Sequence, residues 1–377
     1  MLNWVDKNVE SDGGGGGGGG GDGDGAGGAV EGGPQSGSPV EDEAAKKRKI
    51  ELDPEERKRL GVAKFIGWLN EVVDEEQLTD YYAFQAKQFR AFWDGLYHGY
   101  YGYFEDETPI CAKRFTDEPS PRGGHLHQTL QIFSVKVTGL RGGLQFPLDV
   151  YGMVATRDQL DHNCNIIFNR RRDHCQTLTQ EDLSLVLTGP SRAVVFADPV
   201  VLEVELKVKG NIESEDRVLS FLAPRLKSHA FELDSSLFKK CYTSKLSTLE
   251  FTVGDIFFSL EATISVKVIE GSWRHDSHGQ FAASTASIED EKVVLLCFGD
   301  DEKVPLDGDN ILLSRSVVSV ELEGKLIVSV NTRSKKVKDE AVEVHAIFTP
   351  RKMGRTCEEL TVGFCKMEVT VAWSLFA

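Results

Sequence analysis

Carboxylate side chains gather around one stretch of the sequence, where they could supply oxygen ligands to a hard cation. Asp149 and Tyr151 lie in this stretch, and Asp158 and Asp161 follow shortly after it. Calcium binds mainly to carboxylate and carbonyl oxygens, so residues of this kind on neighbouring turns could hold it. With the basic residues Arg170 and Arg172 further along the chain, they form one candidate binding loop.

The acidic part of this loop resembles the first calcium loop of a C2 β-sandwich. A C2 site also takes ligands from a later loop with closely spaced aspartates, and Asp198 stands alone at that place. A second acidic stretch, 300–309, lacks the spacing of an EF-hand. An exposed polar turn is therefore the default interpretation of both stretches, and C2-like calcium or lipid binding is kept as an alternative.

Residues that could hold zinc or act as nucleophiles show no spacing typical of such sites. His162 lies next but one to Cys164, and His174 adjoins Cys175, but neither pair matches a zinc module. Gly-x-Ser-x-Gly, a P-loop and a Gly-x-Gly-x-x-Gly fingerprint after a strand are all missing from the sequence. We therefore expect that the chain is not an enzyme. We also expect it to have no metal, no cofactor and no catalytic residue.

Two groups of side chains could contact nucleic acid. Arg170 to Arg172 could grip a phosphate, and the aromatic stretch 81–104 could stack on bases. The arginines lie near Asp173 and Asp182, which favours an exposed turn, and the aromatic residues recur at helical spacing, which favours a packing face. The net charge of -16 further disfavours nucleic acid as the main partner, because phosphate contacts come from excess Lys and Arg.

Glycine dominates the beginning of the chain, which predicts a disordered tail over 1–52. Near the end of this tail, Lys46, Lys47, Arg48 and Lys49 are typical of a nuclear-import signal, although neighbouring acidic residues also suit a solvated charged run. The seven cysteines lie far apart, with no secretory leader and no apolar run of bilayer length. We expect a soluble intracellular chain, cytoplasmic or nuclear, that is not secreted and has no membrane span.

A helical, aromatic-rich segment and linker are predicted over 53–125. Asp53 precedes a proline and two glutamates, which predicts a helix with Asp53 as its N-cap and an apolar stripe as far as residue 73. A second helix is predicted over about 75–97, where apolar residues recur near helical spacing.

From about residue 129 the apolar period changes to two, which predicts antiparallel strands. Strands are predicted over 200–208, 257–268, 342–348 and 367–375. No long helical pattern interrupts them, so the fold is predicted to be all-β, a sandwich or barrel of two related antiparallel halves, 126–246 and 247–377.

Two short motifs indicate that the halves are related. Ser134–Val137 recurs as Ser265–Val268, and Arg192–Val195 recurs as Arg315–Val318 with serine in place of alanine. The strand predicted over 257–268 could belong to both halves and join them into one rigid body.

Several segments of the β region resemble the domain of unknown function 6598, a family expanded in grasses. They are Phe146–Gly152, Asn165–Arg170, Cys175–Leu178, Leu187–Pro190 and 202–210. The resemblance covers roughly 128–375 and implies a plant domain with no catalytic residues to transfer. Some relatives place this domain behind a ribosome-inactivating N-glycosidase domain, but too few residues precede the β region here for such an enzyme.

These observations favour a non-enzymatic binding or scaffold protein whose rigid β body presents loops to a protein partner. A defence-related factor or enzyme that acts on RNA or ribosomes is one alternative, and C2-like binding is the other. The sequence leaves the identity of the partner and the oligomeric state open.

Overall fold

The computed structural model describes residues 53, 55–56, 59, 61, 63, 80–121, 123–197, 199–228, 234–273, 277–299, 304–334 and 341–376. The tail predicted over 1–52, with its basic residues 46–49, lies outside this set, as does most of the first predicted helix. The start of that helix is confirmed, because Oδ1 of Asp53 accepts hydrogen bonds from the backbone N–H groups of Glu55 (2.8 Å) and Glu56 (3.1 Å).

The helical segment consists of α2 (Tyr81–Leu96) and the short α3 (His98–Tyr101). Asp80 caps α2, since its Oδ1 accepts a hydrogen bond of 3.1 Å from the N–H of Ala83. The second predicted helix is therefore confirmed from residue 81 onward, and 75–79 lie outside the described residues.

The first half of the β region is a sandwich of two antiparallel layers. Its strands are β1 (His127–Leu140), β2 (Leu148–Arg157), β3 (Asn165–Arg170), β4 (Gln176–Leu178), β5 (Val194–Val195), β6 (Val200–Val208), β7 (Arg217–Leu222), β8 (Arg225–Leu226), β9 (Ser236–Thr243) and the first part of β10 (Ser247–Glu270). One layer has the order β3-β2-β6-β7, with β4 beside β2 and β8 beside β6; β1, β5, β9 and β10 form the other. Alternate residues from both layers, such as Leu202, Val204 and Phe251, fill one buried core.

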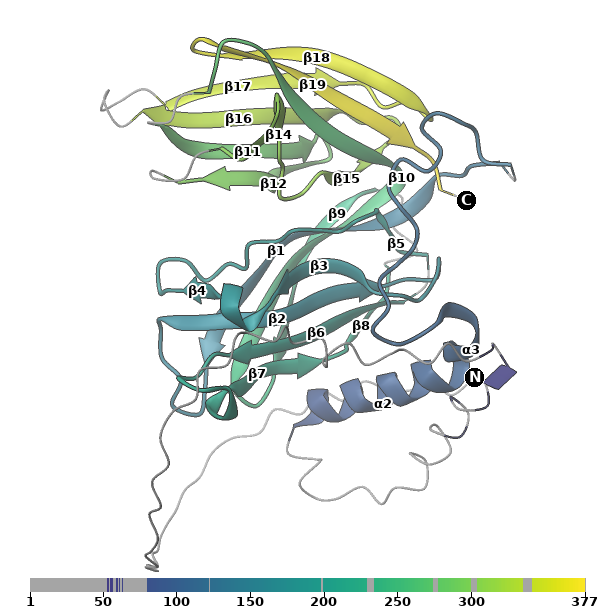
Figure 1. Ribbon diagram of the computed structural model, residues 1–377. Helices are drawn as coiled ribbons and strands as arrows, with labels where there is room; N and C mark the ends of the chain where they lie inside the picture. The colour runs from purple at the N-terminus through teal and green to yellow at the C-terminus, as the bar shows by residue number, and fades with distance from the viewer. Residues whose placement is uncertain are drawn as a thin grey trace, which may run out of the picture. The chain divides into compact units, whose positions relative to one another are not determined.

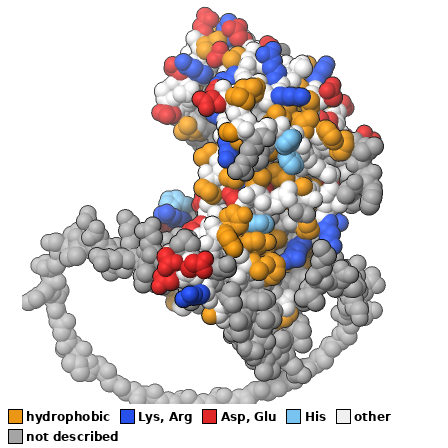
Figure 2. Space-filling view, turned by 90° about the vertical axis from the view of Figure 1, so that its right-hand side faces the viewer, with side chains coloured by type: hydrophobic (Ala, Val, Ile, Leu, Met, Phe, Trp, Pro, Cys, Tyr) orange, Lys and Arg blue, Asp and Glu red, His pale blue; other side chains and the backbone are white. Residues whose placement is uncertain are grey.

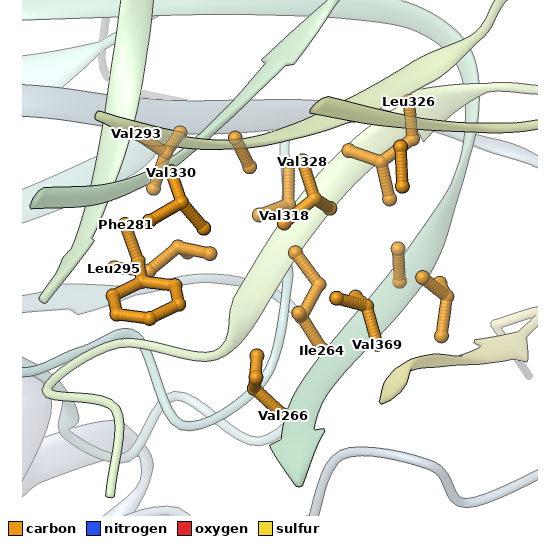
Figure 3. Close-up of a cluster of buried hydrophobic side chains, with 14 of the residues drawn as sticks. Ile264, Val266, Phe281, Val293, Leu295, Val318, Leu326, Val328, Val330 and Val369 are labelled. Atoms are coloured by element: carbon orange, nitrogen blue, oxygen red, sulfur yellow. The ribbon is translucent and has the colours of Figure 1, made fainter. Parts of the chain in front are cut away.

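The second half repeats this architecture. Its further strands are β11 (Ser277–Thr285), β12 (Ile288–Phe298), β13 (Leu306–Asp307), β14 (Asn310–Ile311), β15 (Val317–Glu321), β16 (Leu326–Ser334), β17 (Ala341–Phe348), β18 (Gly354–Val362) and β19 (Cys365–Ser374). One layer has the order β12-β11-β16-β17, and the other contains β10, β14, β15, β19 and β18. Figure 3 shows the core between them, where Phe281 and Val330 meet Ile264 and Val369 from the opposite layer.

The long strand β10 belongs to the sheets of both halves (Figure 1). Up to Ile256 it pairs with β1 and β9, with one further β1 pair at Ser259; β15 pairs with it from Ser259 and β19 from Glu261 onward. Between these stretches, Phe258 has a φ of 43° and a 58% exposed side chain. A bulky residue in this backbone region is strained, which places a local distortion where the strand changes partners.

The all-β fold of two antiparallel sandwich-like halves behind a short helical segment is confirmed. The relation between the halves is visible in the pairing, because the short strands β5 and β15 follow Arg192 and Arg315 and pair with β1 and β10. The domain boundary at 246–247 stays a prediction. The structure adds that 247–256 contribute to the core of the first half.

Candidate functional site

The six residues of the predicted binding loop lie at two ends of the first sandwich. Asp149 and Tyr151 lie near the start of β2, beside the end of β3 that carries Arg170 and Arg172. Asp158 and Asp161 follow the end of β2. An extended strand rises about 3.3 Å per residue, so this strand separates the two groups and they do not form one site.

Near the start of β2, the carboxylate of Asp216 accepts hydrogen bonds from three other residues. The Tyr151 hydroxyl donates to Oδ2 (2.5 Å), and Arg172 donates Nε–H to Oδ2 (2.8 Å) and Nη2–H to Oδ1 (3.1 Å). The backbone N–H of Gly210 donates to Oδ1 at 2.7 Å. We call these four residues the Asp216 anchor.

Charge and hydrogen bonding in the Asp216 anchor favour the ionised carboxylate. The hydrogen bonds from Arg172 and then from Tyr151 hold the pKa of Asp216 well below its usual range. Burial, reinforced by the Asp216 carboxylate, raises the pKa of Tyr151 to about 12. The Tyr151 hydroxyl is therefore a neutral donor at physiological pH, and Asp216 is an ionised acceptor.

The Asp216 anchor ties β2 to two connections, 171–175 between β3 and β4 and 209–216 between β6 and β7. Each connection contains a 3₁₀ turn, Arg172–His174 and Glu213–Glu215. The two connections expose Arg171, His174 and Ile212, the last with a 58% exposed side chain. We call these three side chains the anchored loop surface.

Asp158 and Asp161, the predicted calcium ligands, instead bind Arg192. Its Nη1–H and Nη2–H groups donate to Oδ2 (2.6 Å) and Oδ1 (2.8 Å) of Asp158, and Nη2–H also donates to Oδ1 of Asp161 (3.0 Å). The side chain of Arg192 is 2% exposed. Asp158 also accepts a hydrogen bond from the N–H of Val195, and Asp161 accepts one from the hydroxyl of Thr108.

These contacts give both aspartates a structural role. A calcium ion would have to replace a fully buried arginine, and breaking a buried ion pair leaves an uncompensated charge that costs about 3–5 kcal/mol. Asp198, considered above for the later loop, lies outside the described residues. The geometry therefore favours an internal ion-pair network at this turn over a cation site.

Glu261 of β10 lies beside this network and joins it to the segment before β1. Its carboxylate accepts hydrogen bonds of 2.8 Å from the backbone N–H groups of Lys113 and Ala193. Burial raises the pKa of Glu261. The adjoining cavity, lined in part by Arg192, Glu261 and Ser374, has a volume of about 20 Å³. That volume suits a water molecule rather than a substrate.

The aromatic stretch 81–104 packs against the outer face of the first sandwich. Phe89, Trp93 and Phe104 are at most 8% exposed, and they cluster with Val201 of β6. The guanidinium of Arg157 lies 4.0 Å from the centre of the Phe104 ring and donates to Glu203 at 2.6 Å. The packing interpretation is confirmed for these residues, whose rings are therefore not available to stack on bases.

The sulfur and nitrogen groups noted in the sequence also have structural surroundings. Cys164 is 1% exposed, and burial raises the pKa of its thiol to about 12, which disfavours the thiolate that binds metal or attacks carbon. The ring of His162 stacks on Tyr97 at 4.0 Å. All seven cysteines are free. Among the described residues, no group of three or more His, Cys, Asp and Glu side chains is arranged to hold a metal ion.

Sequence reasoning missed Asp216, Arg192 and Glu261. Arg192 carried a usable signal, because an arginine two residues before a strand that begins with Val-Val recurs at Arg315, and both are 2% exposed. Asp216 follows other acidic residues in a polar connection, and nothing in that pattern marks it as a hydrogen-bond centre.

Figure 2 shows one face of the molecule, on which described basic and acidic side chains are interspersed and hydrophobic side chains lie between them. None of the helices in the described part of the chain combines the length and the hydrophobicity that crossing a bilayer requires.

Comparison with solved structures gives remote similarities to C2-containing proteins, among others. The two C2 domains of calcium-bound extended-synaptotagmin 2 match with a TM-score of 0.23 and 10% identity, over 67% of this chain and all of that one. Human GIVD cytosolic phospholipase A2 matches with a TM-score of 0.21 and 11% identity, over 66% of this chain and 33% of that one. These scores carry no argument about fold or function.

The curated proteins contain no match to this chain. Residues 129–371 match the family described as domain of unknown function DUF6598. The match covers most of the chain and spans both sandwich halves, from β1 to β19. The chain therefore belongs to the DUF6598 family.

Proposed function

We propose that this chain is a non-enzymatic binding module that presents the anchored loop surface to a protein partner. The observation that carries the proposal is the Asp216 anchor, in which one carboxylate fixes two surface connections to β2. Binding is stronger when the binding loops are already ordered, because less conformational entropy is lost on association. The anchor supplies this order without any ligand.

The composition of the anchored loop surface suits a protein partner. Ile212 exposes apolar area, and Arg171 and His174, on the other connection of the anchor, offer hydrogen-bond donors on exposed side chains. Protein interfaces combine apolar contacts at the centre with polar contacts at the rim, and arginine is enriched in them. Asp173 and Glu213 lie within the same two turns, so this surface carries both signs of charge, which disfavours a nucleic-acid backbone.

Affinity capture with matched variants tests this proposal. The full chain is immobilised and exposed to an extract of its source tissue, beside the variants Ile212→Asp, Arg172→Ala and Arg351→Gln. Ile212→Asp places a charge on the anchored loop surface. Arg172→Ala removes the hydrogen bonds from Arg172 that hold the two connections together. Arg351 is exposed on the second half, between β17 and β18, so Arg351→Gln serves as the control.

We expect one protein to be enriched by the unchanged chain and by Arg351→Gln, to be lost with Ile212→Asp and to be weakened with Arg172→Ala. Enrichment that survives Ile212→Asp unchanged, or no enrichment at all, would contradict the proposal. With the purified partner, the variants should show the same order of affinities. The weaker variants should differ mainly by a faster dissociation rate.

A further inference from the structure

An open groove lies on the second half, separate from the anchored loop surface of the first half. Its volume is about 550 Å³. Three adjacent strands and the residue after one of them supply its lining, which consists of His278, Gly279, Gln280, Phe298, Gly299, Asn331 and Arg333. This volume lies within the range of small-molecule sites, about 300–1,000 Å³.

Strand register brings the polar side chains of the groove together. His278 is the cross-strand partner of Arg333, and Gln280 is the partner of Asn331, on β11 and β16. Cross-strand partners and residues two apart on one strand lie on the same face of a sheet. The four polar side chains therefore form two adjacent rows on one face.

Glycine shapes the groove between these rows. Gly279 lies between the two polar residues of β11, and a Cβ atom there would lie only 2.0 Å from the carbonyl oxygen of Asn331. Gly279 pairs with Phe298 on the other side, and Phe298 is 3% exposed. By strand alternation, Gly279 and Phe298 belong to the core-facing side of the sheet, so what they contribute between the polar side chains is backbone, and the close strand approach at Gly279 keeps that backbone low.

Three of the four polar side chains, Arg333, Asn331 and Gln280, have few partners within the described part of the chain. No hydrogen bond or ion pair joins the side chains of Arg333 and Asn331 to another described residue, and Gln280 has only a 4.0 Å contact from the Cys297 thiol. Glu343, the cross-strand neighbour of Asn331, is paired with Lys292 at 2.9 Å. The guanidinium of Arg333 and the two amides therefore remain able to bind a ligand.

We propose that this groove binds a phosphate monoester of a small molecule. The planar guanidinium of Arg333 matches the oxygens of a phosphate group in a bidentate arrangement, and Asn331 can donate to the same group. The amide of Gln280, the cross-strand partner of Asn331, then lies where a hydroxyl group of the esterified molecule can form a hydrogen bond. The volume exceeds that of a bare phosphate, which favours an ester over the free anion.

Isothermal titration calorimetry on the full chain tests the assignment with glucose 6-phosphate as the probe. Inorganic phosphate and glucose serve as comparison ligands. We expect glucose 6-phosphate to bind with a Kd below about 1 mM, inorganic phosphate to bind at least about threefold more weakly and glucose to give no measurable heat. Arg333→Gln should raise the Kd for glucose 6-phosphate by at least about tenfold, and Arg351→Gln should leave it unchanged.

Three results would overturn the assignment: no binding of glucose 6-phosphate, equal losses in Arg333→Gln and Arg351→Gln, or inorganic phosphate binding as tightly as the ester. Asn331→Ala gives a second test should Arg333→Gln fold poorly. This variant should bind glucose 6-phosphate several-fold more weakly. An unchanged affinity would contradict the assignment of the phosphate site to this groove.

Discussion

The Arg172 guanidinium binds both carboxylate oxygens of Asp216, which lies 44 residues further along the chain. Asp216 also receives the Tyr151 hydroxyl, so one acidic side chain connects strand β2 with the turns on either side of it. A bidentate arginine–carboxylate pair fixes orientation as well as distance. The two turns therefore have a defined geometry before any partner arrives.

Replacing Arg172 by Ala should loosen both connections of the Asp216 anchor. Two donors to Asp216 and one to the carbonyl oxygen of Gly210 would be lost. We expect faster amide hydrogen exchange over 209–216 and a melting temperature lower by a few degrees. Arg171→Ala is the control, since Arg171 is exposed and adjacent. Equal exchange rates in the two variants would show that the anchor does not order these turns.

Replacing Arg192 by Met should destabilise the chain by about 3–5 kcal/mol, because two buried carboxylates would lose their counter-charge. The triple variant Arg192→Met, Asp158→Asn, Asp161→Asn should recover part of this loss, since it also removes the two carboxylate charges that Arg192 pairs with. Urea unfolding measures both. A loss below about 1 kcal/mol for Arg192→Met would contradict the buried network described for this turn.

Calcium should leave the thermal midpoint of the full chain unchanged. Arg192 already occupies the carboxylate oxygens that a C2-like site would offer at Asp158 and Asp161. A ligand that binds only the folded state raises the midpoint with concentration. Melting curves with calcium and with a chelator test this, and a rise that Asp161→Asn abolishes would restore the cation site.

Much of the architecture could be predicted from the sequence, because strands with one buried face show a period of two. The strand predicted over 200–208 coincides with β6, and the recurring Arg-x-Val-Val motif indicated two related halves. The sites were harder to predict. Asp158 and Asp161 looked like cation ligands, because their partner Arg192 lies more than thirty residues away and only the fold brings it near.

The exposed polar groups of the second half show the same limit. Gln280 and Asn331 are unremarkable polar residues in strands, and only the pairing of β11 with β16 places them side by side. Asp216 is a hydrogen-bond centre only because the fold brings β2, 171–175 and 209–216 together, and no local sequence pattern links these three segments. Local spacing reports which face of a strand is buried, whereas side-chain networks depend on contacts between distant segments.

At Phe258, glycine should be more stabilising than alanine, which reverses the usual order within a strand. Alanine at a φ of 43° retains the left-handed backbone strain that glycine avoids, worth about 1 kcal/mol. In an ordinary strand, glycine is instead about 0.5–1 kcal/mol less stable than alanine. Unfolding of Phe258→Gly and Phe258→Ala should therefore favour glycine. The ordinary order would show that β10 has no such distortion where it changes partners.

Acidification from about pH 7.5 to 5.5 should lower stability partly through His127. Burial, and secondarily the nearby His125, lower the pKa of His127 below 6.5. The unfolded chain then takes up the proton first, so the stability contributed by the neutral ring is present above pH 6.5 and is lost as the pH falls towards the folded pKa. His127→Gln should flatten this pH dependence, and the exposed control Arg351→Gln should not. Equal slopes in both variants would contradict the assignment to His127.

Hydrogen exchange of the full chain, alone and with the captured partner, tests the proposed binding surface most directly. If the anchored loop surface is the interface, amides over 171–175 and 209–216 should exchange more slowly in the complex, and the strands β11, β16 and β17 of the second half should be unchanged. Slower exchange confined to the second half, with no change over 171–175 and 209–216, would contradict the account.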